Sequence, residues 1–319
     1  MGCGVSKKVH PQPPIIRSPS ALVPVSTPVD ISLFQYESPS KRDLAVGFVY
    51  FNIARSKRIL MNYLYVTNKL RMAKIPFFTL ELVYDAPEIP EATHIPGKSA
   101  MFHKEQLCHL LEQHIPAEFT KLLFLDADIL FGNPQWYSRV SDLLETYQVI
   151  QPFRDAVFLD LTYTKQLIKK SSVLFMDRQQ YDSKFHPGFG WGFQRSWFRK
   201  IGFFQYAITG CGDTFSVSAW LRAPLPPAYP FQEAYRSSYN EYKQHPPPTM
   251  TFCEGTIYHL WHGNDNNRQW KTRHAILEGV ADVRSILTIE KGKSFELTDA
   301  VIEKKLRDYF VNRVDDGIQ

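Results

Sequence analysis

The sequence predicts an α/β protein with a mostly parallel sheet flanked by helices and a looser second half. The main observation is that apolar runs of strand length alternate with helix-spaced apolar residues through the first half of the chain, which is the pattern of successive β-α-β units. The chain has 319 residues, of which 44% are hydrophobic. It is therefore long and apolar enough to bury a large core, as one large domain or two small ones.

The first half predicts its elements in a regular order. The expected sequence is a strand at 44–51, a helix at 56–74, a strand at 77–84, a loop at 87–97, a helix at 99–114 capped by Ser99, a strand beginning at 121, a short helix at 142–147 and a strand at 148–153. Pro76 and Pro116 end the first two helices, because proline cannot continue a helix.

The second half is less periodic and richer in loops. We expect strands near 172–176 and 256–260, and an amphipathic helix at 298–314 with Thr298 as its N-cap. That helix is expected to pack on the domain. The chain then divides into a Pro- and Ser-rich disordered tether at 1–42, a folded domain at 43–290 and a C-terminal helical segment at 291–319.

Two carboxylates follow the apolar run that begins at Lys121, with one residue between them. Asp126 and Asp128 end a predicted buried strand, and ligands in open α/β sheets bind beyond the carboxyl ends of such strands. Two neighbouring carboxylates repel each other unless a cation joins them, and Mg²⁺ or Mn²⁺ commonly bridges one or two carboxylates to a diphosphate. The pattern indicates a metal-dependent enzyme acting on a nucleotide diphosphate; the alternative is a strand-end turn or a helix cap.

Composition excludes several other classes. The net charge of +5 comes from scattered Lys and Arg residues, which argues against a nucleic-acid-binding protein. The four cysteines have no paired spacing, so neither a zinc site nor a disulfide framework is expected. No segment is long and apolar enough for a transmembrane helix or a signal peptide. We therefore expect a cytoplasmic, reducing location.

The first residues nevertheless predict attachment to a membrane. Met1-Gly2-Cys3 with Ser6 fits the N-myristoylation pattern, in which Gly2 is the acceptor, and Cys3 is a candidate for palmitoylation. Two acyl chains give stable anchoring, whereas one gives only marginal anchoring. The expected location is the cytosolic face of a membrane; an unmodified N-terminus is the alternative.

Three motifs downstream of the Asp pair carry further candidate residues. Gly190-Trp191-Gly192 suggests backbone close to a ligand with an indole as a stacking surface, or else a glycine turn with a core Trp. Asp213, after Gly212, is either a helix cap or a general base. His259 and His262 are candidate metal ligands or core histidines, and the cations that follow could hold a diphosphate.

The order of these motifs resembles metal-dependent GT-A glycosyltransferases over roughly residues 44–290, and within them a group of bacterial and viral-type sugar transferases. The shared features are Phe51-Asn52, Lys104-Glu105, Asp126-Ala127-Asp128, Gln151-Pro152-Phe153, His186-Pro187-Gly188, Gly212-Asp213 and His259-Leu260-Trp261-His262-Gly263. The resemblance implies a GT-A fold and transfer of a sugar from a nucleotide-diphosphate sugar, by default a UDP-sugar, to an acceptor hydroxyl. The acceptor would belong to a glycan, a glycolipid or a protein.

The resemblance also implies roles for individual residues. Asp126 and Asp128 would bind Mn²⁺ or Mg²⁺ together with His259 or His262, of which His262 is favoured. Asp213 would deprotonate the acceptor in an inverting reaction. The donor would contact Phe51, Asn52, Arg55, Lys104, Asp126, Ala127, Arg268 and Lys271. Gly190, Trp191, Gly192 and Gly212 would line the sugars.

Two other functions compete with this interpretation. A nucleotidyltransferase would normally carry a Gly-rich phosphate loop after the first strand, and the sequence Phe51-Asn52-Ile53-Ala54-Arg55 contains no glycine. A catalytically silent, lipid-anchored binding module is the second alternative. The sequence leaves open the identity of the sugar, the nucleotide and the acceptor, the stereochemistry and the oligomeric state.

Overall fold

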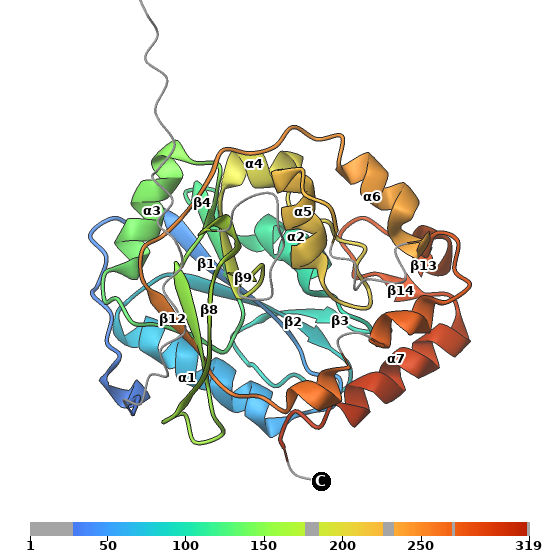
Figure 1. Cartoon of the computed structure of the whole chain (residues 1–319), viewed down its shortest axis with the longest axis horizontal. Helices are drawn as coiled ribbons and strands as arrows, with labels where there is room; N and C mark the ends of the chain where they lie inside the picture. The colour runs from blue at the N-terminus through green and yellow to red at the C-terminus, as the bar shows by residue number, and fades with distance from the viewer. Residues whose placement is uncertain (1–27, 176–184, 226–232, 270–271, 318–319) are drawn as a thin grey trace, which may run out of the picture.

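The computed structural model of the chain describes residues 28–175, 185–225, 233–269 and 272–317 (Figure 1). Gly2, Cys3 and Lys271, for which the sequence predicts lipidation or donor binding, lie outside the described residues. No helix within the described ranges has the length and apolar character needed to cross a membrane.

The described residues form a seven-stranded main sheet. In spatial order its strands are β11 (Met250–Phe252), β6 (Val149–Gln151), β10 (Gly190–Gln194), β4 (Lys121–Leu125), β1 (Leu44–Phe51), β2 (Phe77–Val83) and β3 (Thr93–Pro96). Neighbouring strands run parallel except that β10 is antiparallel to both β4 and β6. The predicted α/β class with a mostly parallel sheet is therefore confirmed.

Helices cover both faces of this sheet (Figure 1). They are α1 (Lys57–Met72), α2 (Lys104–His114), α3 (Trp136–Thr146), α4 (Arg195–Lys200) and α5 (Gly212–Leu221). Alternate side chains of β1 enter different cores, as the period of a strand requires: Val46 and Phe48 pack with α1 and α3, whereas Ala45 packs with α2 and α5. The sheet is thus buried on both faces, which explains the continuous apolar runs in its sequence.

A second sheet stands beside the first and carries a long hairpin. Its order is β5 (Ile129–Phe131), β12 (Thr256–His259), β7 (Asp155–Leu159), β8 (Gln166–Ser172) and β9 (Phe185–His186). The sequence predicts a strand at 172–176, but β8 ends at Ser172 and a 3₁₀ turn follows at Val173–Phe175. The sequence does not predict the β7–β8 hairpin, because the largely exposed strand β8 shows little alternation of apolar and polar residues.

The remaining elements complete the C-terminal side. They are α6 (Arg236–Tyr242), β13 (Leu287–Thr288), β14 (Glu296–Leu297) and α7 (Ala300–Asn312). The last helix packs on the domain through Ile302, Leu306, Tyr309 and Phe310, as expected. Its N-cap is Asp299 and not the predicted Thr298, because the Asp299 carboxylate accepts hydrogen bonds from the backbone N–H groups of Val301 and Ile302 at 2.8 and 3.0 Å.

Several other predicted boundaries are wrong for local reasons. The loop expected at 87–97 contains β3, which extends the sheet. Helix α2 begins at Lys104 and not near Ser99, whose hydroxyl instead accepts from the backbone N–H of Leu297. Helix α3 begins at Trp136, six residues before the predicted start. Part of the predicted tether is also ordered, since Val29 is buried in the core shared with α1.

Candidate active site

Backbone pairing brings Asp128 beside His259. Strand β4 ends directly before Asp126, and β5 starts directly after Asp128. Because β5 pairs antiparallel with β12, His259 lies opposite Ile129. The backbone N–H of Leu260 also donates to the carbonyl of Asp128 at 2.8 Å. The two motifs therefore meet beyond the carboxyl end of β4, where the second sheet begins, although they are 131 positions apart in the chain.

Asp128, His259 and His262 form a candidate metal centre. His262 Nε2 lies 2.9 Å from Asp128 Oδ2, and His259 Nε2 lies 3.5 Å from the same oxygen. One ligand atom from each of the three residues lies within 4.8 Å of the others. Asp128 Oδ1 is buried and has no hydrogen-bond partner among the described residues. A buried carboxylate oxygen without a donor, beside two imidazoles, fits Mn²⁺ or a similar divalent ion.

The protonation states suit metal binding. Burial lowers the pKa of His259 to about 3, so this imidazole is neutral at pH 7 and offers a lone pair. Burial opposes ionisation of Asp128, but the two histidines and Arg268 outweigh it and hold its pKa below the ordinary value. A neutral imidazole and an ionised carboxylate are the forms that a divalent ion requires.

Asp126 belongs to a different cluster. Its carboxylate forms an ion pair with the ammonium group of Lys104 at the start of α2, and its backbone N–H donates to the carbonyl of Phe189 at 2.8 Å. The metal group described above does not include Asp126. The structure thus separates the two predicted metal ligands of the Asp pair: Asp128 faces the histidines, and Asp126 pairs with the half-buried Lys104.

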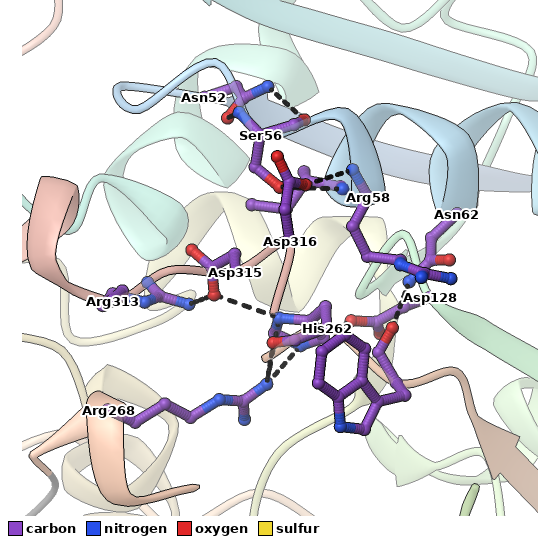
Figure 2. Close-up of polar contacts among 12 residues, drawn as sticks. Asn52, Ser56, Arg58, Asn62, Asp128, His262, Arg268, Arg313, Asp315 and Asp316 are labelled. Atoms are coloured by element: carbon purple, nitrogen blue, oxygen red, sulfur yellow. Dashed lines mark hydrogen bonds and ion pairs between the residues drawn. The ribbon is translucent and has the colours of Figure 1, made fainter. Parts of the chain in front are cut away.

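The C-terminal segment returns to this centre (Figure 2). Asp315, which is 4% exposed, lies between Arg313 at 3.0 Å and His262 Nδ1 at 3.6 Å. Asp316 accepts from the hydroxyl of Ser56 at 2.6 Å and from the backbone N–H of Arg58 at 2.7 Å. A carboxylate at this position stabilises the start of α1. Neither aspartate was predicted, because the sequence shows no motif there.

A cavity of about 540 Å³ opens beside the metal centre. Its wall includes these residues predicted for the site: Phe51, Asn52, Lys104, Asp126, Ala127, Asp128, Asp213, His259, His262 and Arg268. It also includes residues that were not predicted: Glu105, His186, Cys211, Arg273, Arg313 and Asp315. A guanidinium nitrogen of Arg268 lies 2.6 Å from His262 Nε2, so positive charge reaches the metal centre. The cavity is therefore lined by cations and carboxylates over an aromatic wall.

Asp213 stands at the start of α5 on the wall of this cavity. The N-cap of α5 is Cys211, which has a left-handed φ of 71°, so Asp213 is not the cap. Its Oδ1 accepts from the backbone N–H of Thr214 at 2.7 Å. A Cβ on Gly188 would lie 2.6 Å from the other oxygen. Glycine at 188 is what lets the loop after β9 approach the Asp213 carboxylate.

Gln151 holds that loop in place. Its side-chain N–H group donates to the carbonyls of His186 at 2.8 Å and Gly188 at 3.3 Å, while its oxygen accepts from the hydroxyl of Ser172 at 2.6 Å. Gln151 is fully buried. The Gln-Pro-Phe motif of the sequence therefore positions the loop and does not itself line the cavity.

Glu105 is a titratable group of the cavity to which the sequence assigned no role of its own. It follows Lys104 on α2, is 5% exposed and lines the cavity. Its carboxyl lies against Gly212, where any Cβ would collide with it. Burial raises the pKa of Glu105 from its ordinary 4.5 to about 7, and the nearby Asp213 adds to this effect while Lys104 opposes it. The sequence feature that could have pointed to Glu105 is its place beside Lys104 in the Lys104-Glu105 motif.

Trp191 does not line the cavity as predicted. It is 1% exposed, packs against Trp220 at 5.2 Å between ring centroids, and donates its indole N–H to the carbonyl of Pro187 at 2.7 Å. Gly190 and Gly192 face Leu125 and Ile150 on the opposite side of β10. Because strand side chains alternate, the glycines allow close packing within the sheet while Trp191 enters the core.

Three other predicted contacts differ in the structure. Gly212 contacts Glu105 and does not form part of the cavity wall. Arg55 is 47% exposed, pairs with Asp85 at 3.6 Å and lies outside the cavity wall. Asn52 lines the cavity, but its side-chain amide already hydrogen-bonds Ser56, Tyr50 and Glu88. Asn52 therefore orders the turn after β1.

No protein-family model matches the chain, and no curated protein matches its sequence. Among solved structures, a Drosophila beta-1,4-galactosyltransferase 7 mutant in complex with manganese, UDP-Gal and xylobiose matches with 12% identity and a TM-score of 0.35, over 66% of this chain and 64% of the other. The catalytic domain of the same enzyme with xylobiose matches with 10% identity and a TM-score of 0.33 over the same shares.

A third match is a protein assigned as a nucleotide-diphospho-sugar transferase from Desulfovibrio desulfuricans G20. It is 10% identical, with a TM-score of 0.33, over 88% of this chain and 100% of the other. The chain spans about 64% of the length of the two galactosyltransferase structures. At these low scores the matches assign no activity to the chain, so the case for a function depends on the geometry of its own site.

Proposed function

We propose that the protein is a metal-dependent glycosyltransferase that moves a sugar from a nucleotide-diphosphate sugar to an acceptor hydroxyl. The observation that carries this proposal is the convergence of Asp128, His259 and His262, with an unpartnered carboxylate oxygen, at the edge of a cavity that also holds Asp213. A divalent ion bound there would neutralise the charge that develops on a departing nucleoside diphosphate.

The cavity supplies groups for both ends of such a donor. Arg268 and Lys104 bring positive charge to the side near Asp128, where charge-assisted hydrogen bonds could hold phosphate oxygens. On the cavity wall Phe310 packs edge to face against Phe51 and at a tilt against Phe102. An aromatic wall of this kind offers an apolar surface to a nucleobase.

Asp213 is the proposed base. In the reaction the acceptor oxygen forms a bond to the anomeric carbon, the bond between that carbon and the diphosphate oxygen breaks, and the acceptor proton passes to the Asp213 carboxylate. The diphosphate leaves with the bonding electron pair. Inversion at the anomeric carbon and a UDP-linked donor remain predictions of the resemblance.

A donor screen tests the proposal. Purified protein is incubated with UDP-, GDP- and dTDP-sugars, with and without Mn²⁺, and release of nucleoside diphosphate is measured. We expect Mn²⁺-dependent release from one donor, abolished in Asp128→Asn and retained in Asp142→Asn, an exposed aspartate on α3. If no donor is turned over and no nucleotide binds in the presence of Mn²⁺, the chain is a catalytically silent module instead.

Membrane attachment through Gly2 and Cys3 is a separate part of the proposal. Both residues lie outside the described residues, and the acylation pattern of the sequence supports it. Acylation would place the site at the cytosolic face of a membrane, within reach of glycolipid, lipid-linked or protein acceptors. Gly2→Ala should abolish the incorporation of labelled myristate in cells and lower the membrane-bound fraction, and unchanged incorporation of the label would exclude acylation at Gly2.

A further inference from the structure

Large exposed apolar side chains gather on one part of the domain. Ten such side chains occur among the described residues, and seven of them lie on three segments, at 28–33, 57–74 and 160–170. The seven are Leu33, Met61, Leu64, Met72, Leu161, Leu167 and Ile168. On α1 the exposed residues Lys57, Met61, Leu64, Asn68 and Met72 recur at helical spacing, so they form one outward stripe. We call the three segments together the hairpin face.

Hydrogen bonds join the three segments into one surface. The backbone N–H of Val29 donates to the carbonyl of Thr164 in the hairpin loop at 2.8 Å. The hydroxyl of Tyr163 donates to Asn62 of α1 at 2.5 Å, and the hydroxyl of Tyr65 donates to the carbonyl of Ile31 at 2.9 Å. Figure 1 shows α1 and the loop between β7 and β8 together at the lower left. The three segments that carry these side chains are therefore joined to one another.

The hairpin face also carries a concentrated positive charge. Its three segments contain eight Lys and Arg residues and two Asp, a net charge of +6, while the whole chain has +5. The two acids are already engaged: Asp30 accepts from the backbone N–H of Ser32, and Asp160 accepts from those of Thr164 and Lys165. Two acids outside the face pair with its cations, Glu91 with Arg71 and Asp155 with Lys169. The face keeps a net positive charge when these two acids are counted with it.

We propose that the hairpin face docks on the surface of an anionic membrane. Exposed Leu and Met side chains interspersed with lysines match the chemistry of an interfacial helix, whose apolar groups enter the headgroup region while its cations contact acidic lipids. The described chain also begins on this face, at residue 28, and the segment before it carries the acylation pattern. The N-terminal segment with the acylation pattern is therefore connected to the folded domain at the hairpin face.

Docking in this way places the cavity at the membrane interface. The segments that form the hairpin face also line the cavity, through Ile59 and Asn62 of α1 and through Ile168 and Lys170 of β8. If the proposed transferase function holds, an acceptor whose hydroxyl lies at the interface could enter without leaving the bilayer. This step rests on the proposed function, whereas docking itself does not.

Vesicle binding tests the docking surface without acylation and without turnover. The full chain, made in bacteria without an N-myristoyltransferase, is sedimented with vesicles of phosphatidylcholine alone or with 30% phosphatidylserine. We expect binding that needs phosphatidylserine and weakens with salt. Lys74→Gln with Lys165→Gln should weaken it roughly 10-fold or more, since each lysine near such a surface adds about 1 kcal/mol. Leu161→Ser with Leu167→Ser should weaken it by a similar factor, through lost apolar burial.

Matched variants on α7 serve as controls. Val301 and Val311 are 64% and 60% exposed, and Lys304 and Lys305 lie between them. Val301→Ser with Val311→Ser and Lys304→Gln with Lys305→Gln should bind vesicles like the unchanged protein, and circular dichroism verifies folding of every variant. Failure to bind phosphatidylserine vesicles, or equal loss in the α7 variants, would overturn the proposal. The face would then be assigned to an acidic protein partner.

Discussion

Replacing Glu105 by Gln should change how stability depends on pH. Glu105 is 5% exposed, its carboxyl lies against Gly212, and its pKa of about 7 exceeds the ordinary 4.5 mainly because of burial. In the folded state the proton is therefore held to higher pH than in the unfolded chain. The folded state binds more protons between pH 4.5 and 7, so the free energy of unfolding falls as pH rises through this window.

The size of the effect follows from the shift. One unit of pKa corresponds to about 1.4 kcal/mol, so the rise from 4.5 to about 7 sets an upper limit of roughly 3 kcal/mol for the stability lost between pH 4.5 and 8. Glutamine keeps the size of the protonated acid and cannot ionise. Glu105→Gln should therefore gain stability relative to the unchanged protein by roughly 1–3 kcal/mol when pH is raised from 5 to 8.

Urea unfolding at pH 5 and pH 8 with a chelator measures this difference. Titrating groups far from Glu105 occur in both proteins and cancel when the two free energies of unfolding are compared, so the difference reports Glu105 together with its charged neighbours Lys104, Asp126 and Asp213. Glu118→Gln, an exposed acid just after the same helix, is the control and should show no change between the two pH values. The reasoning is wrong if the difference between Glu105→Gln and the unchanged protein is the same at both pH values.

Two further predictions concern the frame around the site. Asp316→Asn removes the charge that caps α1 and should lower the free energy of unfolding by about 1 kcal/mol in urea, whereas an unchanged value would show that the cap is not needed. Gly188→Ala places a Cβ 2.6 Å from the Asp213 carboxylate and should lower kcat roughly 10- to 100-fold while Mn²⁺ affinity, measured by calorimetry, is kept. Normal turnover would show that catalysis does not depend on the close approach of Gly188 to Asp213.

Much of the main sheet was predictable because buried parallel strands have continuous apolar sequences. Strands β1, β2 and β4 are each apolar and bounded by helix or turn signals, so their places could be read locally. The carboxyl end of β4 then indicated where Asp128 would lie. Only the resemblance predicted that His259 would lie close to Asp128. The pairing of β5 with β12, which brings them together, joins segments far apart in the sequence and cannot be inferred from either segment alone.

The parts that were not predicted depend on long-range contacts or on which face a side chain occupies. Trp191 and Phe193 alternate with two glycines in β10, and this period of two places both aromatics on one face, in the core. A strand assignment at that point would have predicted the burial of Trp191. By contrast, nothing near Asp316 in the sequence indicates its partner Ser56, which lies 260 residues away.

Asp315 is expected to orient His262 for metal binding. His262 presents Nδ1 to the Asp315 carboxylate at 3.6 Å and Nε2 to Asp128 at 2.9 Å. Asp315 is nearly buried and paired with Arg313 at 3.0 Å, so its position is well defined. A guanidinium nitrogen of Arg268 also lies 2.9 Å from Nδ1 and 2.6 Å from Nε2, and an arginine can only donate to these nitrogens. The Asp315 carboxylate favours the proton on Nδ1 against this neighbour and so leaves the Nε2 lone pair for the ion; loss of such a partner typically weakens metal affinity 10- to 100-fold.

Asp315→Asn should therefore weaken Mn²⁺ binding by roughly that factor, measured by calorimetry on the full chain. Because asparagine leaves Arg313 without its counter-charge, the variant should also unfold at a lower urea concentration without metal, so affinity is measured under conditions where circular dichroism shows both proteins folded. Asp308→Asn, which changes an exposed aspartate of α7 paired with Lys304, should leave Mn²⁺ affinity unchanged. Equal Mn²⁺ affinity in Asp315→Asn and the unchanged protein would mean that the neighbours of Asp128 alone hold His262, and that the C-terminal segment serves α1 and not the metal centre.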